Sequence, residues 1–237
     1  MSTRRRELLG AATTPDGESL TLSIEGAQHV VRVRGETLMT SRSSGSEQAM
    51  AELAFAHGAP RVGARILVGG LGIGFTLRAL LDRVDASARI TVVELLAEVV
   101  HWNRDLLAAF AGRPLDDPRV DVRVGDVLDH LSKIGQGYDA ILLDIDNGPQ
   151  AFTVRGNERL YRAAGLAMLF RALRAGGVAV LWSAFRSRAF EQRLRRAGFH
   201  ARSVPVRAQA GKGARHTLFV ATRPGGAMPA HGTAAGR

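Results

Sequence analysis

The stretch Ala64–Arg78, with the sequence ARILVGGLGIGFTLR, decides the fold of this chain. It begins with an apolar run typical of a buried strand, and from Thr76 onward its apolar spacing is that of a helix. Between them stand Gly70, Gly72 and Gly74, which adopt positive φ at little cost and let a ligand approach the backbone closely. A strand, a tight glycine turn and a helix in this order predict a crevice in which helix N–H groups face a ligand.

An acidic residue follows the glycine turn at a spacing that suggests its partner. Glu94 ends a second apolar run, twenty residues after Gly74. In dinucleotide-binding folds an acid at that offset accepts hydrogen bonds from the ribose hydroxyls. The dinucleotide fingerprint GxGxxG itself is absent, because Phe75 stands where the third glycine would be. We therefore expect a site for a single nucleoside, held by the three glycines and Glu94.

Composition excludes several kinds of site. The chain has 237 residues, is 46% hydrophobic and contains no cysteine, so disulfides, thiolate metal sites and cysteine nucleophiles are excluded. Its seven histidines form no HxH or HxxxH pair, and we expect no metal. No segment approaches the roughly 20 apolar residues of a membrane helix, and the apolar run after Arg4–Arg6 is too short for an export signal. The sequence predicts a cytoplasmic protein without a membrane partner.

The chain carries a formal net charge of +10, nearly all of it from arginine. A strong positive field attracts nucleic acid or other anions at long range. Arginines concentrate between Arg186 and Arg196, near the helix expected at 190–197. Two interpretations remain open, a nucleic-acid or acidic partner and a solvated basic surface, and the second is favoured.

The remaining sequence predicts a small N-terminal unit before a larger α/β domain. Short alternating apolar runs separated by glycine turns indicate a β-meander. Ser44 and Glu47 have the spacing of a capping box at the start of the helix that follows. The expected order is a disordered N-terminus at 1–17, a small β-meander with a linking helix at 18–58, a Rossmann-like catalytic domain at 59–222 and a disordered tail at 223–237.

Strand and helix patterns alternate through the larger domain. Strands are expected near 65–69, 89–94, 120–124, 138–144, 178–183, 201–207 and 216–222. Helices are expected near 75–84, 96–110, 127–134, 158–174 and 190–197. This alternation predicts an α/β fold with a doubly wound, Rossmann-like, mostly parallel seven-stranded sheet. The last two strands suggest an antiparallel hairpin at one edge.

Gly125 and Asp126 end the third expected strand of this sheet. An aspartate there suits hydrogen bonding to the exocyclic amine of an adenine. Asp also favours the N-cap position of a helix, here the one near 127–134. The neighbouring Glu94 and the glycines favour the adenine role.

Asp144 and Asp146 follow three apolar residues at the end of the fourth expected strand. Ligands of open α/β sheets bind at the carboxyl ends of the strands. Two carboxylates there suit a cationic amine and the removal of its proton. The sequence through Pro149 is also strong turn chemistry, which would aim the acids.

Residues from about 65 to 222 resemble the spermidine/spermine synthases, or polyamine aminopropyltransferases, which share the fold of S-adenosylmethionine-dependent methyltransferases. The matching stretches are Ile66–Arg78, Glu94 with Glu98, Asp117–Val120, Gly125–Asp126, Tyr138–Asp144, Asn157–Tyr161 and Leu173–Gly177. The resemblance implies transfer of an aminopropyl group from decarboxylated S-adenosylmethionine to a small-molecule amine such as putrescine. A homodimer is common in that family.

The resemblance also implies roles for individual residues. Gly125 and Asp126 would bind the adenine of the co-substrate. Asp144 would be the base that deprotonates the attacking amine, and Asp146 would bind the substrate amine. Gln48 would match the second residue of a Tyr-His or Tyr-Gln pair that contributes to the substrate site.

Three departures from the family pattern keep other functions open. Ile73 stands where the family has an aspartate that holds the amine of the decarboxylated donor. The loop Asp144–Pro149 is shorter than the family's, and Glu47 replaces the tyrosine of the pair before Gln48. The alternatives are a methyltransferase that uses S-adenosylmethionine and a non-catalytic nucleoside-binding relative.

Overall fold

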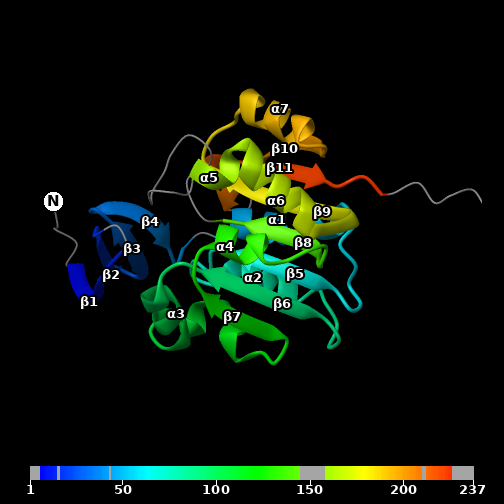
Figure 1. The fold of residues 1–237 in the computed structure, drawn as a ribbon. Helices are drawn as coiled ribbons and strands as arrows, with labels where there is room; N and C mark the ends of the chain where they lie inside the picture. The colour runs from blue at the N-terminus through cyan, green and yellow to red at the C-terminus, as the bar shows by residue number, and fades with distance from the viewer. Residues whose placement is uncertain (1–5, 15–16, 43, 145–157, 210–211, 226–237) are drawn as a thin grey trace, which may run out of the picture.

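The computed structural model describes residues 6–14, 17–42, 44–144, 158–209 and 212–225. These residues form one large sheet of seven strands and one small sheet of four strands (Figure 1). The large sheet contains β5 (Arg65–Gly69), β6 (Arg89–Glu94), β7 (Val120–Val124), β8 (Tyr138–Leu143), β9 (Leu173–Ser183), β10 (His200–Gln209) and β11 (Lys212–Thr222).

The large sheet has the strand order β10-β11-β9-β8-β5-β6-β7. The five strands from β9 to β7 pair in parallel, and β11 and β10 join antiparallel at the edge beyond β9. The predicted fold class is confirmed. The chain winds outward in opposite directions from β5 and β8, and ligands of such sheets bind beyond the carboxyl ends of strands at this reversal.

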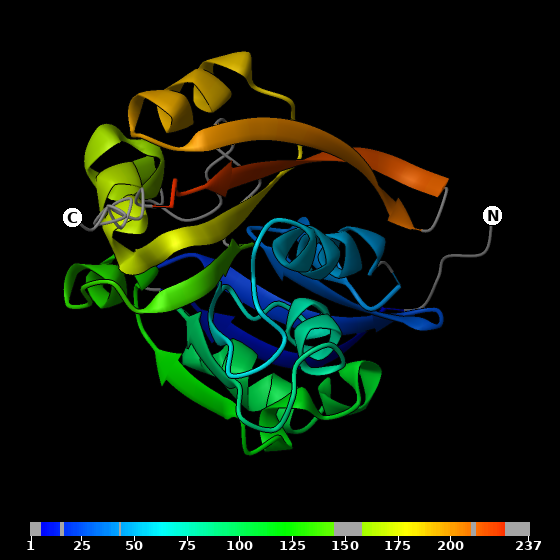
Figure 2. The same cartoon turned by 90° about the vertical axis from the view of Figure 1, so that its right-hand side faces the viewer.

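Helices cover both faces of the large sheet (Figures 1 and 2). One face carries α1 (Gly45–Ala56), α2 (Phe75–Leu81) and α3 (Ala97–Arg104), followed by the short turns η1 (Ala108–Ala111) and η2 (Pro114–Asp116). The other face carries α4 (Val127–Ser132), α5 (Glu158–Tyr161), α6 (Ala163–Ala172) and α7 (Arg188–Arg196).

Side chains of the central strands alternate between the two cores that these helices create. In β5, Ile66 and Val68 belong to the core beneath α1–α3, whereas Leu67 belongs to the core beneath α4–α7. All three are at most 1% exposed. Burial on both faces explains why the strand is an unbroken apolar run, as is usual for parallel strands covered by helices.

The small sheet is an antiparallel meander of β1 (Arg6–Thr13), β2 (Ser19–Glu25), β3 (Gln28–Val33) and β4 (Glu36–Thr40). It packs beside α3 and η1. Gly10 of β1 lies so close to α3 that a Cβ there would stand 2.9 Å from Nε1 of Trp102. The ring centroids of His29 and Phe110 are 4.6 Å apart.

The structure differs from the sequence predictions in three elements. Disorder predicted over 1–17 is wrong for Arg6–Thr13, which pairs with β2 as the outer strand of the meander. The predicted helix 158–174 is broken at Arg162, whose backbone is extended, and β9 begins at Leu173. The predicted helix 96–110 ends at Arg104, because Asp105 leaves helical geometry.

No helix within the described part of the chain is long and apolar enough to cross a membrane.

Candidate active site

The glycine turn after β5 lines the cavity described below through Gly70 and Gly72. Gly70, Gly72 and Gly74 have φ of 85°, 56° and 85°, in the left-handed region that favours glycine. Gly74 is the N-cap of α2, and a Cβ there would lie 3.0 Å from Cγ of Pro114. The side-chain amide of Asn103 donates to the carbonyl of Gly72 at 2.8 Å, which fixes the turn from α3.

Glu94 joins the glycine turn to the end of β6. Its carboxylate accepts hydrogen bonds from the backbone N–H groups of Leu71 (2.7 Å) and Leu96 (3.0 Å), one on each oxygen. The side chain is buried, and burial raises the pKa of Glu94 while the backbone donors oppose that rise. A carboxylate oxygen can accept more than one hydrogen bond, so each oxygen of Glu94 can also accept a hydrogen bond from a hydroxyl group of a ligand.

Asp126 caps α4, which was one of its two predicted roles. Its Oδ1 accepts from the N–H of Leu128 at 2.7 Å. Asp126 and Gly125 also line the cavity described below. The adenine-binding role stays a prediction, since capping and ligand contact are compatible on the two oxygens of one carboxylate.

Asp144 directly follows β8, between the ends of the two central strands. Its backbone N–H donates to the carbonyl of Gly69 at 2.9 Å, which continues the pairing of β8 with β5. Burial, together with the charge of Glu47, raises the pKa of the Asp144 carboxyl to about 7. The second predicted acid, Asp146, lies outside the described residues.

Glu47 is an acidic residue of the site that the sequence analysis did not assign. It lies in the first turn of α1, and the hydroxyl of Ser46 donates to its Oε2 at 2.8 Å. The predicted capping box is wrong, because the Ser44 side chain makes no cap hydrogen bond. The sequence contained a signal for this position. Glu47 precedes the apolar residues Met50 and Ala51, both buried, by three and four positions, which places Glu47 on the inward face of the helix.

Gln48 is not brought to this site. Its neighbour Glu47 lines the main cavity, whereas Gln48 is exposed and borders a separate hollow beside Arg78 and Phe110. Successive helical residues point about 100° apart, so only one of the two can face the sheet edge.

A cavity of about 560 Å³ lies at the carboxyl ends of the parallel strands. It is lined by the glycine turn and by Glu47, Glu94, Asp126 and Asp144. Strand β4 covers the glycine turn, with Met39 Sδ 3.8 Å from the position of a Cβ on Gly72. Trp182 of β9 and His216 of β11 form the opposite wall, with ring centroids 4.6 Å apart in an edge-to-face arrangement. Burial lowers the pKa of His216, which favours a neutral imidazole.

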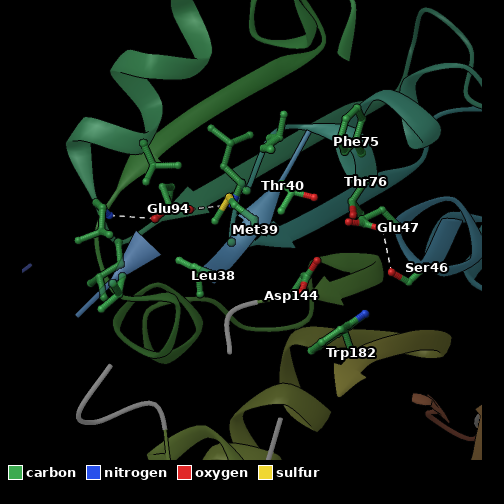
Figure 3. A pocket seen from close by; sticks show the side chains of 18 of the residues that line it. Leu38, Met39, Thr40, Ser46, Glu47, Phe75, Thr76, Glu94, Asp144 and Trp182 are labelled. Atoms are coloured by element: carbon green, nitrogen blue, oxygen red, sulfur yellow. Dashed lines mark hydrogen bonds between the residues drawn. The ribbon is translucent and has the colours of Figure 1, made fainter. Parts of the chain in front are cut away.

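Among the residues that the structure describes, the lysine, arginine, aspartate and glutamate side chains lining the cavity are all acidic. They are Glu47, Glu94, Asp126 and Asp144. Among the described lining residues there is no arginine or lysine, although the whole chain has a net charge of +10. In Figure 3, Glu94 lies at one end of the cavity, and Glu47, Asp144 and Trp182 lie at the other. We call these the nucleoside end and the amine end, after their predicted ligands.

A doubly wound sheet with an acidic cavity at the carboxyl ends of its strands places this chain among the Rossmann-like α/β proteins. Residues 52–193 match the family model described as the spermine/spermidine synthase domain. This match covers more than half of the chain, and the chain therefore belongs to that family. The resemblance seen in the sequence is confirmed at the level of the family.

Curated relatives match a shorter part of the chain. The polyamine aminopropyltransferase of Bacillus subtilis (strain 168) is 36% identical over 90 residues, which are 38% of this chain and 31% of the relative. The polyamine aminopropyltransferase of Synechococcus sp. (strain JA-2-3B'a(2-13)) is 37% identical over 105 residues, 43% of this chain and 32% of the relative. The matched part thus spans about a third of the length of these relatives.

Solved structures show that the fold extends over nearly the whole chain. A spermidine synthase in complex with the transition-state analogue AdoDATO superposes with a TM-score of 0.75, at 19% identity, over 92% of this chain and 74% of that one. Spermidine synthase from Thermotoga maritima superposes with a TM-score of 0.73, at 17% identity, over 92% and 73%. The similarity at this level of identity concerns the fold.

Proposed function

We propose that the protein transfers an aminopropyl group from decarboxylated S-adenosylmethionine to a small-molecule amine such as putrescine. The amine nitrogen attacks the propyl carbon next to the sulfonium, a C–N bond forms and the C–S bond breaks. Sulfur keeps the bonding electron pair and leaves as the neutral thioether methylthioadenosine. Membership of the spermine/spermidine synthase family supports this reaction.

The observation that carries the proposal is the acidic lining that the described residues give to the cavity. S-adenosylmethionine has a carboxylate on its tail, which needs a cation or several hydrogen-bond donors when it is buried. The decarboxylated compound has only an ammonium group and the sulfonium. Four carboxylates, without arginine or lysine among the described lining residues, favour the ligand with the greater positive charge.

Asp144 is proposed as the general base. A protonated amine cannot attack carbon, so its proton must pass to an acceptor before or during C–N bond formation. A carboxyl whose pKa is raised to about 7 by burial and by Glu47 is a stronger base than an exposed aspartate. The sulfonium is already a good leaving group, and the remaining acceleration comes from in-line positioning of the two substrates.

The nucleoside end is proposed to bind the adenosyl part of the donor. Glu94 would accept the ribose hydroxyls, Asp126 the adenine amine, and the glycine turn would lie against the sugar. The backbone donors on Glu94 favour its ionised form, which is the form that accepts two hydroxyl hydrogen bonds.

Formation of methylthioadenosine tests the proposal directly. The purified protein is incubated with saturating decarboxylated S-adenosylmethionine and, in turn, with putrescine, cadaverine, 1,3-diaminopropane and spermidine. We expect amine-dependent release of methylthioadenosine in stoichiometric amounts with the aminopropylated product. If no methylthioadenosine were released with any member of a wider set of di- and polyamines, the proposal would be overturned. A non-catalytic relative would then be favoured.

One observation favours methyl transfer as the second candidate. Ile73, only 4% exposed, lines the cavity where the family's glycine turn carries a donor-binding aspartate. Titration calorimetry with both donors separates the two functions. Tighter binding of decarboxylated S-adenosylmethionine supports aminopropyl transfer, and tighter binding of S-adenosylmethionine supports methyl transfer.

A further inference from the structure

We propose that Glu47 is a substrate-binding carboxylate that acts with Asp144 to hold a primary ammonium group at the amine end of the cavity. The inference rests on the proposed function only for the identity of the ligand. It assigns the role of the missing acid of the glycine turn to the first turn of helix α1. The ammonium belongs either to the donor's tail or to the acceptor amine, and the experiment below separates the two.

Position is the first argument. Glu47 points from the first turn of α1 into the cavity, toward the end at which Asp144 and Trp182 also lie (Figure 3). The Ser46 hydroxyl donates to one of its carboxylate oxygens at 2.8 Å. That hydrogen bond helps to fix the orientation of the side chain.

Charge balance is the second argument. Burial raises the pKa of Glu47, and its charge in turn raises the pKa of Asp144. Two carboxylates that repel one another in a partly buried site destabilise each other's ionised forms. Within the described residues neither acid forms a salt bridge, in a chain with 32 arginines and lysines. A cation supplied by the ligand would neutralise both.

A comparison within α1 supports a binding role over a merely structural one. Glu52 lies on the exposed side of the same helix and pairs with Arg83 at 3.0 Å. Glu47 makes no such pair with any residue that the structure describes, and the Ser44 side chain makes no cap hydrogen bond. A half-buried acid without a cationic partner among the described residues is unfavourable for folding alone, and such residues cluster at functional sites.

The cavity around the acids also suits an aminoalkyl chain. Trp182 provides carbon surface at the amine end, Ile73 lines the same cavity, and burial lowers the pKa of His216 beside Trp182. Methylene groups would pack on this surface while the terminal ammonium reaches the acids. An apolar Ile73 is then compatible with a cationic tail, because the countercharge comes from Glu47.

The test replaces Glu47 with glutamine and uses Glu52→Gln as the matched control on the same helix. Calorimetry measures binding of methylthioadenosine, which lacks the ammonium, and of decarboxylated S-adenosylmethionine, which has it. Steady-state kinetics give KM for the diamine. Glu47→Gln preserves side-chain size and the acceptor for Ser46, so methylthioadenosine affinity is expected to stay within twofold of that of the unmodified protein.

We expect Glu47→Gln to weaken at least one ammonium-bearing ligand tenfold or more, and Glu52→Gln to weaken neither. A higher Kd for decarboxylated S-adenosylmethionine assigns the ammonium to the donor. A higher KM for the diamine, with donor affinity unchanged, assigns it to the acceptor. Glu47→Asp, which keeps the charge, should recover part of the lost affinity.

The inference is overturned if donor affinity and diamine KM in Glu47→Gln both stay within twofold of the unmodified protein. It is also overturned if Glu47→Asp is as defective as Glu47→Gln, since charge would then not be the cause. Failure of the proposed function has a different signature. The unmodified protein would form no methylthioadenosine, while calorimetry would still show whether binding of ammonium ligands depends on Glu47.

Discussion

The two ends of the cavity differ in whether hydrogen bonds from the protein satisfy the carboxylates that lie there. At the nucleoside end, the Glu94 carboxylate accepts two backbone hydrogen bonds and is part of the connection between β6 and the glycine turn. At the amine end, Asp144 has a pKa raised to about 7, and the causes are burial and Glu47. The carboxylate at the first end is satisfied by the fold itself, and we propose that a bound cation neutralises the acids at the second.

This difference predicts that substitutions at the amine end change activity more than they change stability, whereas substitutions at the nucleoside end change both. When a carboxylate that accepts hydrogen bonds from the protein is removed, the buried donors of those bonds are left unpaired. Loss of a carboxylate that the protein does not satisfy removes an unfavourable charge. Each prediction below tests one side of this contrast.

The largest effect is expected from Asp144→Asn. An amide cannot accept the amine's proton, and general-base catalysis contributes about 10²–10⁴-fold. We expect kcat to fall within that range while methylthioadenosine affinity stays within twofold, measured by product formation and calorimetry. Gln48→Ala is the control, since Gln48 is exposed outside the cavity. Full activity of Asp144→Asn would remove Asp144 from the mechanism.

A strong pH dependence is expected next. Asp144 must be ionised to act as base, so kcat/KM should rise about tenfold per pH unit up to its pKa near 7 and then level off. Because the charge of Glu47 raises that pKa, Glu47→Gln should shift the midpoint to lower pH. The profile is measured over pH 5–9. A midpoint that stays the same in Glu47→Gln would show that the two acids are not coupled.

The opposite pattern is expected at the nucleoside end for Glu94→Gln. A glutamine amide group would face one of the N–H donors of Leu71 and Leu96, and an unsatisfied buried donor costs about 1–3 kcal/mol. We expect methylthioadenosine affinity to fall about tenfold or more and the melting temperature to fall by several degrees. A loss of affinity at unchanged melting temperature would contradict the structural role of Glu94.

Asp126→Asn separates helix capping from adenine recognition with a smaller effect. Asn and Asp are about equally good N-caps, so the hydrogen bond to Leu128 should survive and the melting temperature should hardly change. If Asp126 also accepts the adenine amine, methylthioadenosine should bind roughly 3–10-fold more weakly, because one carbonyl oxygen replaces two carboxylate oxygens. An unchanged affinity for methylthioadenosine would show that Asp126 only caps the helix.

The smallest effect concerns the stability of the unliganded protein. Asp144 has a pKa of about 7 in the folded state and 3.8 as reference, so the native state binds more protons between these values. Its contribution therefore lowers the free energy of unfolding as pH rises from about 4 to 7. Asp144→Asn should melt at a higher temperature than the unmodified protein at pH 8, by about 2–4 °C for each kcal/mol relieved. Equal melting temperatures at pH 8 would show that this acid does not destabilise the native state.

The same contrast explains what could be predicted from the sequence. The glycine turn and Glu94 belong to strand–turn–helix segments whose geometry is local, and both were located from spacing alone. Glu47 was assigned to a capping box, because local spacing cannot show which face of a helix a distant sheet will cover. Strand β1 was likewise missed, because its pairing with β2 stabilises a segment whose own composition is weakly patterned.

The family match begins at residue 52 and ends at residue 193, yet several walls of the cavity lie outside it. Strand β4 and Glu47 precede the matched segment, and His216 follows it. The glycine turn, Glu94 and Asp144 lie within it. The glycine turn, Glu94 and the proposed base Asp144 thus lie in one matched segment, whereas Glu47, β4 and His216 are carried on its flanks. Under the proposed function, exchange of those flanks between relatives would change the acceptor while the reacting groups stay in place.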